Sequence, residues 1–546
     1  MGCEEKKVSF WRKWVPVLVL ALGLAIIIID TTLLNVSLGN VIRDLNTDIQ
    51  KIQWVITAYS LTLAALTITG GRLGDLLGRK RMFVAGAIIF AVGSYIASIS
   101  RNVGTMIAGE SIIEGIGAAL MMPATASLLV STYKGRERAI AMGIWGGVAG
   151  AASAVGPILG GYLTTHFSWR WGFRINIVVA LLLVLGSIII KECRDEEEKP
   201  GLDIPGVILS STGMLAMVFG IIESSTYGWW KAKEAFISFG HALNLGGYSI
   251  VPLSLLIGLI LLISFVVWEI ETAKRGNTPL VSMTLFKNQQ FVSSVGITMI
   301  MALAQAGLIF SIPIFLQSVR GLDAFETGMA FLPMSIAALI FAPMSAFFSN
   351  KIAPKRLIQI GFISMVAGIA FIYKTLNVDS TSQDLVPGMI FYGIGMGLMM
   401  AQINNMALSA VSIQEAGEAS GVNNTLRQIG ATLGAAVIGA ALLTALSTNL
   451  IDGINGSKVI PDKAKAQIST EVSSQTSNVE FGGGARIGQN IPQKITDEIT
   501  LISHKATTDS NKMALLYTFF ATIVGFLATF FLPRQKNLEV ERSATK

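Results

Sequence analysis

The dominant pattern in this chain is a series of long apolar stretches separated by short polar segments. Each stretch contains roughly 20 mostly apolar residues, the length that an α-helix needs to cross the hydrocarbon core of a bilayer. The sequence therefore predicts an all-α integral membrane protein with about 14 transmembrane helices. The stretches lie near residues 13–38, 54–74, 82–100, 105–130, 139–163, 171–191, 204–224, 248–269, 290–316, 325–347, 356–374, 386–410, 424–446 and 513–533.

Basic residues are concentrated in alternate connections between these stretches. They precede the first stretch and recur between the second and third, the fourth and fifth, and the tenth and eleventh. Because Lys and Arg are enriched in cytoplasmic loops, these connections are predicted to face the cytoplasm. An even number of spans puts both chain ends on the same side. We therefore expect a multi-pass protein of the cell membrane with both termini in the cytoplasm.

The composition agrees with this architecture. Of the 546 residues, 52% are hydrophobic and 14% are charged, whereas about a quarter are charged in soluble proteins. The net charge of +7 is explained by the basic loops, so we expect the lipid bilayer, and no nucleic acid, as a partner. Two cysteines and three scattered histidines favour no metal site, and no nucleotide-binding Gly-x-x-x-x-Gly-Lys-Ser/Thr loop occurs. The sequence predicts no metal, no cofactor and no enzymatic activity.

Two distant segments resemble each other. The run 71–86 follows the second stretch and the run 346–361 follows the tenth, and both carry two adjacent basic residues followed by a glycine at the same spacing. This internal similarity pairs the first six predicted helices with the last six and leaves the seventh and eighth as an insertion. We predict an N-terminal six-helix half at 1–191, an inserted helix pair with its loops at 192–289, and a C-terminal six-helix half at 290–546.

A long polar segment, 447–512, separates the last two apolar stretches and is predicted to lie outside the cell. A run of glycines at 482–484 divides it, and the flanking sequences near 461–475 and 492–511 are compatible with helices. An extracellular helical hairpin and a disordered loop are both consistent with this composition.

Asp30 lies inside the first apolar stretch. A carboxylate at that depth costs several kcal/mol unless it is paired, hydrated or protonated. Such a residue in a transmembrane helix points to the binding of a ligand or the transfer of a proton. Asp30 is therefore a candidate functional residue.

The connection between the second and third stretches combines spaced glycines, one acid and a basic cluster. Glycines let two helix ends approach closely, and an acid there can cap the next helix or pair with a base. We interpret the connection as a conformational switch that holds one state and releases in another. The alternative, ordinary topogenic charge, explains the basic residues and leaves the glycines and the acid unexplained. The switch residues are Gly71, Arg72, Gly74, Asp75, Gly78, Arg79, Lys80 and Arg81.

The fifth apolar stretch is rich in glycine around one proline. Small residues allow another helix to pack closely, and a proline removes a backbone donor and bends the helix. This pattern predicts a tight, kinked helix interface on which two halves could rock, and the alternative is generic packing of small residues. The residues concerned are Gly150, Gly156, Pro157, Gly160 and Gly161.

Together these motifs resemble those of a known family. The run 71–81 is similar to the signature loop of the major facilitator superfamily, whose members are transporters of two six-helix halves. The run 29–36 around Asp30 and the run 145–161 resemble the first-helix and fifth-helix motifs of its 14-span drug:proton antiporters, and 168–176 resembles the turn that follows. The resemblance covers essentially the whole chain. It implies the major facilitator fold and export of drugs in exchange for protons.

The fourth helix departs from that family's pattern. Ser111 occupies the position of an arginine implicated in proton coupling in relatives, and Glu114 stands where a glutamine is typical. Glu110 lies one turn from Glu114 on the same helix face. Without the arginine, Asp30 and these two acids are expected to titrate as a coupled set and to attract cations. Our hypothesis is that the set exchanges protons for a lipophilic cation. The alternative is a structural ion pair of Glu110 or Glu114 with Arg174.

The second half offers a different lining. Amides and Arg427 occur at membrane depth, interleaved with methionines whose flexible thioethers suit a site for varied apolar molecules. The same residues can instead hold helices together. The candidate lining residues of the chain are Asn35, Gln305, Gln402, Asn405 and Met399. Three acids near helix ends are expected to be solvated: Glu326, Glu415 and Glu418.

The leading interpretation is a monomeric secondary transporter that exports small lipophilic, cationic drugs in exchange for protons, with the proton gradient as its energy source. Export of a lipid or an endogenous metabolite on the same fold is an alternative. A membrane receptor or regulator that no longer transports is another, and the missing arginine at position 111 is the feature that favours it.

Overall fold

The computed structural model describes residues 10–47, 49–192, 201–233, 236–238, 241–242, 245–349, 351–412, 414–462, 465 and 493–533. Within these residues, 14 helical segments are long and apolar enough to cross a membrane. This confirms the predicted number of spans and the all-α fold. One antiparallel pair of two-residue strands, β1 (Ile237–Ser238) and β2 (His241–Ala242), is the only sheet in the described part of the chain.

We refer to the first six spans as the N-terminal half. Four of them are single helices, the fourth is composite because a π-helical segment interrupts it, and the sixth ends in a 3-10 turn. The elements are α1 (Phe10–Asp44), α2 (Ile49–Leu77), α3 (Arg79–Ser98), α4 (Val103–Met106), η1 (Ile107–Glu114), α5 (Gly115–Thr132), α6 (Gly135–His166), α7 (Arg170–Gly186) and η2 (Ser187–Ile189).

The last six spans form the C-terminal half. Its second span is broken after Ala330, immediately before the Leu332-Pro333 step, because proline at the start of a helix cannot continue the helix before it. The elements are η3 (Leu285–Lys287), α11 (Gln289–Ser318), α12 (Ala324–Ala330), α13 (Leu332–Phe348), α14 (Pro354–Thr375), α15 (Ser382–Ser409), α16 (Ala416–Gly456), α18 (Gln493–Ala528) and η5 (Thr529–Phe531).

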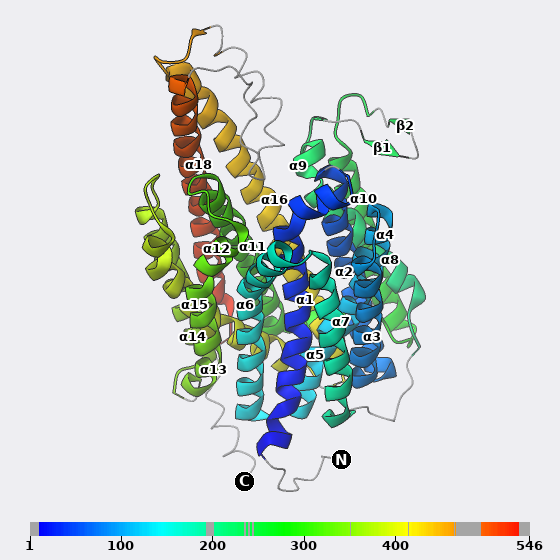
Figure 1. Cartoon of the computed structure of the whole chain (residues 1–546). Coiled ribbons are helices and arrows are strands. Elements are labelled where there is room, and N and C mark those ends of the chain that lie inside the picture. Colours follow the sequence, from blue (N-terminus) through cyan, green and yellow to red (C-terminus); the bar gives the residue numbers. More distant parts are fainter. Residues whose placement is uncertain are drawn as a thin grey trace.

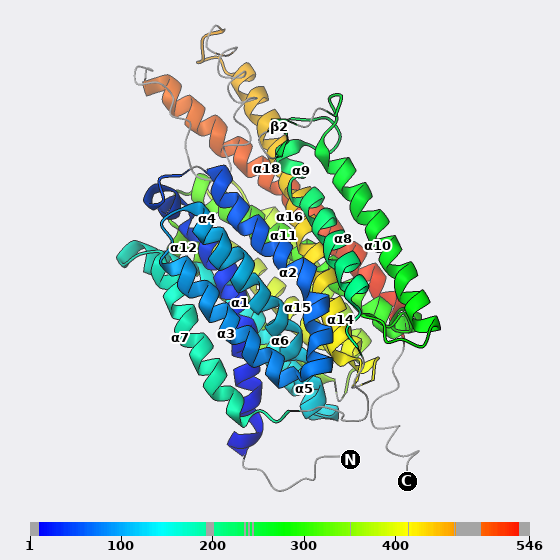
Figure 2. The same cartoon turned by 90° about the vertical axis from the view of Figure 1, so that its right-hand side faces the viewer.

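The inserted pair consists of α8 (Ile204–Ile222) and α10 (Ile250–Lys274), with the short α9 (Ser224–Tyr227) in the connection between them. Asp203 caps α8 by accepting a hydrogen bond from Gly206, and its carboxylate also accepts from the Trp268 indole of α10. Helix α8 lies beside α2 and α16, and α10 packs on the outer side of α8 (Figure 2). Ser211 of α8 fixes this position by donating to the Ala65 carbonyl of α2 at 2.9 Å.

Helices α16 and α18 are much longer than predicted and project together beyond the other helices (Figure 1). Asn449 and Ser510 are hydrogen-bonded at 3.1 Å, and further out Ser457 donates to Glu498 at 2.8 Å. Both ends of the polar segment 447–512 are thus extensions of spanning helices, α16 as far as Gly456 and α18 from Gln493. The helix predicted near 461–475 lies mostly outside the described residues. We call this end of the molecule the hairpin side, and the end where α1 begins and α18 ends the terminal side.

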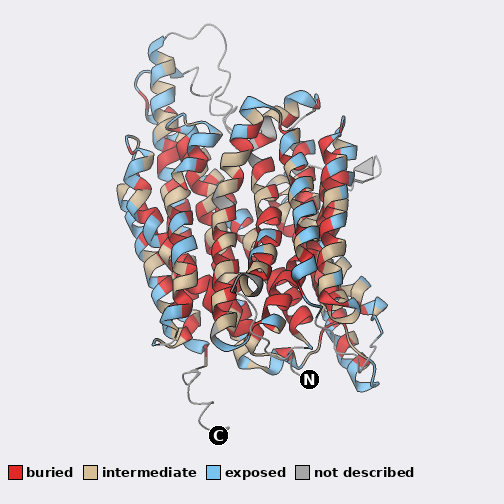
Figure 3. Cartoon of the chain, turned by 60° about the horizontal axis from the view of Figure 1, so that its bottom comes forward, coloured by how far each residue is buried: buried red, intermediate tan, exposed pale blue. Residues whose placement is uncertain are grey.

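The outer surface of the bundle is apolar. Helix α10 illustrates this, because Leu256, Ile260 and Val267 are each more than half exposed although they lie in a span of high hydropathy. Figure 3 shows buried residues between the helices and exposed residues on their outward faces. Such a surface suits contact with lipid tails, so the chain is a multi-pass membrane protein.

Candidate coupling and transport sites

The structure brings Asp30 and Glu114 together. Both are buried, with 2% and 0% of their surfaces exposed. The Asn176 side-chain nitrogen of α7 donates to Asp30 Oδ1 at 2.6 Å and lies 3.2 Å from Glu114 Oε1. Glu110, one turn earlier on η1, is also buried. We call Asp30, Glu110, Glu114 and Asn176 the acidic cluster.

The π-helical segment η1 determines the position of Glu114, and no sequence pattern predicted this segment. Helix α3 approaches η1 so closely that a Cβ on Gly93 would lie 2.5 Å from the Glu114 backbone nitrogen. This contact lets Ser94 donate to Glu114 Oε1 at 2.7 Å. Single π-helical turns are often found at functional sites. The glycine at position 93 is thus a condition for the hydrogen bond at position 94.

Ser111 occupies the place of the family's arginine without replacing its charge. It is fully buried, and its hydroxyl donates to the Val55 carbonyl of α2 at 2.7 Å. The alternative partner, Arg174, does not reach the cluster, because it is exposed and lies 5.1 Å from the centre of the Trp171 ring. The expectation of a structural ion pair with Arg174 is therefore wrong. No basic side chain pairs with Glu110 or Glu114 among the described residues.

The acidic cluster is enclosed by the N-terminal half alone. Its members and hydrogen-bond partners come from α1, α3, η1 and α7, and α2 adds Tyr59, which is buried near the three acids. Within the described part of the chain, one oxygen of each carboxyl and the Tyr59 hydroxyl have no hydrogen-bond partner. Sequence reasoning missed Tyr59 and Ser94, because only the fold brings α2 and α3 to this point.

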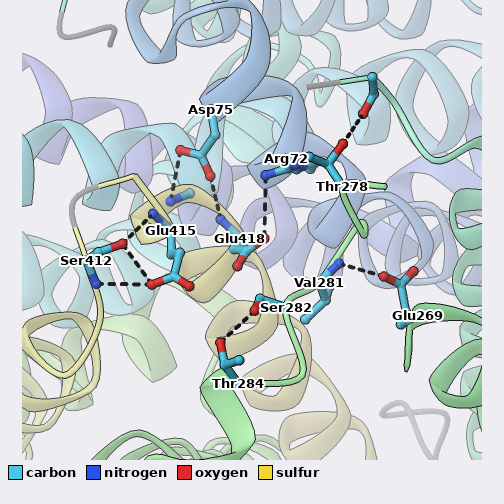
Figure 4. A network of polar contacts seen from close by, with 12 residues as sticks. Arg72, Asp75, Glu269, Thr278, Val281, Ser282, Thr284, Ser412, Glu415 and Glu418 are labelled. Atoms are coloured by element: carbon cyan, nitrogen blue, oxygen red, sulfur yellow. Dashed lines mark hydrogen bonds and ion pairs between the residues drawn. The ribbon is translucent and has the colours of Figure 1, made fainter. Parts of the chain in front are cut away.

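Asp75 of the switch joins the two halves on the terminal side. Its Oδ1 accepts from Arg79 Nε and Nη2 at 3.0 and 2.8 Å, and from the Gly417 backbone at 3.2 Å. Its Oδ2 accepts from the Glu418 backbone at 2.9 Å (Figure 4). Asp75 therefore caps the first turn of α16, which belongs to the opposite half, although the sequence suggested a cap for the next helix. Its carboxylate also complements the positive end of that helix.

Arg72 and Gly71 add to the same contact between α2 and α16. We call the contact surface between the two halves the seam. Arg72 lies 3.7 Å from Glu418, whose carboxyl is 2% exposed, so the expectation that Glu418 is solvated is wrong. A Cβ on Gly71 would lie 2.3 Å from the Gly417 carbonyl oxygen. Gly74 has no such restriction, since its nearest neighbour would be 3.8 Å away. The glycine at position 71 thus allows the two halves to touch.

The basic end of the switch holds the N-terminus of α3. Gly78 has φ of +110°, a conformation that other residues adopt only with strain. The turn places the backbone nitrogens of Lys80 and Arg81 at 3.0 and 3.1 Å from the Glu192 carboxylate. The connection after η2 is thereby fastened to the switch.

The glycines of α6 serve two contacts. A Cβ on Gly156 would lie 1.8 Å from Thr32 Oγ1, and one on Gly160 would lie 3.1 Å from the Leu33 Cα, so both face α1. Helix α6 lies between α1 and the C-terminal half in Figure 1.

On its other face, α6 meets the C-terminal half. A Cβ on Gly150 would lie 2.8 Å from the Met396 methyl group, and one on Gly161 would lie 3.1 Å from the Phe325 Cα. Pro157 packs there as well, beside Gly328 of α12. The motif therefore transmits contacts from α1 to the C-terminal half.

The predicted lining residues of the C-terminal half separate into two groups. Gln402 donates to Ser345 at 3.2 Å and Met399 is fully buried against Gly361, so both hold helices of the same half together. Gln305 and Asn405 are half-buried, and the amide of Gln305 reaches the Met396 sulfur at 3.5 Å. The remaining residue of the set, Asn35, has its side chain outside the described part of the structure.

The other two acids expected at helix ends cap local turns. Glu326 forms a capping box with Asp323 at the start of α12, and Glu415 accepts from Ser412 at 2.8 Å. Both contacts stay within one half of the molecule. Neither acid contributes to the seam that Glu418 forms.

Arg427 of α16 lies at the seam between the halves. Its Nη2 is 3.5 Å from the Met122 sulfur of α5 and 3.4 Å from the Asn424 side-chain oxygen. Nearby, Asn423 donates to Asn404 at 3.0 Å and so links α16 to α15.

Comparison with known proteins agrees with this architecture. The family model of the Major Facilitator Superfamily matches residues 20–435. The chain is 28% identical to the multidrug efflux pump LfrA of Mycolicibacterium smegmatis, over 91% of this chain and 92% of that protein. It is 25% identical to the multidrug resistance protein Stp of Mycobacterium tuberculosis, over 93% and 89% respectively.

A further relative is the tetracenomycin C resistance and export protein of Streptomyces glaucescens, which is 28% identical over 79% of this chain and 76% of its own. Among solved structures, a proton:xylose symporter superposes with a TM-score of 0.56 at 12% identity, covering 98% of this chain and 99% of its own. That likeness concerns the fold. The relatives confirm the resemblance to drug transporters that the motifs indicated, and the chain belongs to the major facilitator superfamily.

Proposed function

We propose that this protein is a secondary active exporter that moves small lipophilic molecules, including cationic drugs, out of the cell in exchange for protons. The observation that supports this most directly is the enclosed contact of Asp30, Asn176 and Glu114. Two carboxyl groups on one amide form a site that can hold different numbers of protons. The similarity of the chain to drug-resistance, export and efflux proteins favours drugs as its substrates.

Proton exchange at this site follows from electrostatics. When both carboxyl groups have lost their protons, two like charges lie beside one amide in a region of low dielectric, and they repel strongly. Binding of one proton removes that repulsion and supplies a donor for a hydrogen bond between the acids. The number of bound protons therefore changes the preferred separation of α1 and η1.

Helix α1 carries this change to the rest of the molecule. Thr32 and Leu33, one turn or less beyond Asp30, are the residues against which Gly156 and Gly160 of α6 pack. Because these contacts leave no room for a side chain, a shift of α1 moves α6. Helix α6 in turn contacts Phe325 at its hairpin side, so the movement reaches the C-terminal half.

The switch then determines access from the terminal side, which we assign to the cytoplasm because Lys80 and Arg81 lie there. Asp75 holds α16 against α2 through two backbone hydrogen bonds. Release of that cap would open the seam towards the cytoplasm. Alternation between a seam closed on this side and one closed at Gly161 and Phe325 gives the alternating access that transport needs.

Transport by purified protein in proteoliposomes tests the proposal. A monovalent and a divalent lipophilic cation would be offered under an imposed pH gradient, while a lumenal pH dye follows the counter-movement of protons. We expect uptake that depends on the gradient, and a loss of at least about tenfold in Asp30→Asn and in Glu114→Gln. The matched control is Glu326→Gln, an exposed cap of α12.

Unchanged gradient-driven transport in both acidic variants would contradict proton exchange at this cluster. Absence of transport of either cation by the unaltered protein would instead favour export of a lipid or metabolite, or a receptor function. A lumenal pH that does not change during transport would contradict antiport.

A further inference from the structure

Arg427 is a cation at membrane depth. It lies 11 residues after the start of α16 at Ala416, which corresponds to about 16 Å along the helix, roughly the middle of a 30 Å hydrocarbon core. A guanidinium does not lose its proton in proteins, so its charge cannot be removed by burial. A charge at this depth requires a compensating group.

No described carboxylate provides that compensation. The guanidinium lies 3.5 Å from the Met122 sulfur and 3.4 Å from the Asn424 oxygen, and no acid lies within 4.0 Å of it among the described residues. By contrast, Arg72 has Glu418 at 3.7 Å and Arg79 has Asp75 at 2.8 Å.

The surroundings of Arg427 are apolar or neutral. Met122 comes from α5 of the opposite half, and the amides of Asn423 and Asn424 lie one turn before Arg427 on its own helix. The Asn423 oxygen has no hydrogen-bond partner in the described residues. Thioethers pack well on aromatic rings, and a guanidinium binds an anionic oxygen pair with two hydrogen bonds.

Arg427 is separated from the acidic cluster. Met122, which it contacts, lies eight residues after Glu114 on the same composite span, which is about 12 Å along a helix. The cluster also faces the interior of the N-terminal half, whereas Arg427 lies at the seam. A negative group beside Arg427 would therefore escape direct repulsion by the three acids.

We propose that Arg427 is the seat for the anionic oxygen of a lipophilic aromatic substrate, such as a carboxylate or a phenolate, bound between the two halves. This rests on the proposed export function and extends its substrates beyond cations. The substrate's ring would lie on Met122, and its oxygen would accept from the guanidinium. An anionic lipid headgroup has the same chemistry and is distinguished from a free substrate by the experiment.

Binding measured on the full-length protein in nanodiscs tests this seat. The probe is 2-hydroxy-1,4-naphthoquinone, an acidic enol that is ionised at neutral pH, compared with its neutral 2-methoxy ether by quenching of tryptophan fluorescence. In phosphatidylcholine nanodiscs we expect the anion to bind at least about tenfold more tightly than the ether, as a charge-assisted bidentate contact allows. Arg427→Gln should remove that preference and Arg427→Lys should keep part of it.

The control is Arg320→Gln, because Arg320 is exposed and its guanidinium reaches the Val378 carbonyl, far from Arg427 in the sequence. Equal binding of both probes by the unaltered protein, or an undiminished preference in Arg427→Gln, would overturn the proposal. A weaker anion affinity when phosphatidylglycerol is added, in the unaltered protein and not in Arg427→Gln, would support the anion seat and assign it to a lipid headgroup.

Gradient-driven transport of a lipophilic cation by Arg427→Gln separates the two proposals. We expect this transport to persist and still to depend on the proton gradient, because the acidic cluster is intact. An equal loss of cation transport and anion binding would mean that Arg427 holds the seam together, which also overturns its role as a seat. Failure of transport in the unaltered protein, with the anion preference present, would remove the export function and leave the binding site.

Discussion

The two halves differ in the chemistry that they bury. The N-terminal half encloses three acids, Asp30, Glu110 and Glu114, and one amide and one serine hydroxyl are the hydrogen-bond partners of Asp30 and Glu114. The C-terminal half buries neutral amides that pair with each other or with serine, such as Asn423 with Asn404, and its buried acid Glu418 lies 3.7 Å from Arg72. Carboxyl groups can take up and release protons, whereas amides cannot.

Under the proposed mechanism, this difference confines proton sensing to the N-terminal half. Two halves with equivalent polar interiors would each bind protons and compete for the same conformational change. Because the acidic cluster is confined to α1 and η1, its protonation acts on a single pair of elements, and the seam at α6 and α16 carries the result. The C-terminal half contributes neutral groups, Arg427 and the Arg72-paired Glu418 along the seam.

The largest effect is expected from breaking the contact at Gly156 between α1, which carries Asp30, and α6. A Cβ there would lie 1.8 Å from Thr32 Oγ1, so Gly156→Leu should push α1 away from α6. We expect gradient-driven transport to fall by at least about a hundredfold while the protein still enters the membrane, since overpacking of this kind costs about 1–3 kcal/mol or more.

The matched control for this change is Gly296→Ala on α11, where an added Cβ would meet nothing within 4 Å. Its transport should equal that of the unaltered protein. Near-normal transport by Gly156→Leu would show that α1 and α6 do not need to touch, and the proposed route from the acids to the C-terminal half would fail.

The next effect concerns the point where the acid of one half caps a helix of the other. Asp75→Ala removes the cap on α16 and the ion pair between Asp75 and Arg79, and breaking a buried pair typically costs about 3–5 kcal/mol. We expect the seam to open on the terminal side. In a chain with its two native cysteines replaced by serine, a cysteine at Val422, which is 4% exposed, should react with a thiol reagent at least about tenfold faster.

Asp323→Ala is the control, because Asp323 caps α12 within its own half. An unchanged reaction rate in Asp75→Ala would mean that the contacts around Gly71 suffice to hold the seam. The acid would then be a structural cap without a role in access.

The global architecture was predictable because hydrophobic length and glycine spacing are local properties of the sequence. The 14 spans follow from the apolar stretches, and the loop near Asp75 was identified by its glycines and charges. The burial of Glu418 was not predictable, because its partner Arg72 lies in the other half of the chain. The position of Glu418 near a helix end suggested that it is solvated, but the contact between the two halves buries it.

The candidate site, too, could be predicted only in part from the sequence. Asp30 and Glu114 stood out because carboxylates are rare in apolar stretches, and their shared partner Asn176 is more than 60 residues away from either. The π-helical turn of η1 depends on the approach of α3 at Gly93, so no residue type at 107–114 announces it. Contacts between distant segments, rather than local preference, decide both features.

A smaller effect is expected at Ser111, the residue in place of the family's arginine. Its hydroxyl donates to the Val55 carbonyl, and loss of such a bond typically costs about 1 kcal/mol. Ser111→Ala should lower the temperature of unfolding slightly and leave gradient-driven transport within about twofold. A tenfold loss of transport at unchanged thermal stability would show that Ser111 takes part in coupling, contrary to a purely structural role.

The smallest effect tests whether any acid outside the cluster contributes to the pH response. Asp44, at the hairpin-side end of α1, bonds to Arg170 and accepts from the Trp169 indole at 3.1 Å; the Arg170 hydrogen bond holds its pKa below the ordinary value of 3.8. A lowered pKa in the folded protein means that the carboxylate stabilises the fold above the unfolded value and that this stabilisation is lost as pH falls. Asp44→Asn should therefore lower the unfolding temperature at neutral pH and make no difference to it in strong acid. The decrease should be small, because the Asp44 side chain is 46% exposed and solvent weakens its ion pair. Transport by Asp44→Asn should keep the pH dependence of the unaltered protein, since Asp44 is not part of the acidic cluster. A changed pH profile of transport in this variant would show that proton sensing extends beyond the acids enclosed in the N-terminal half.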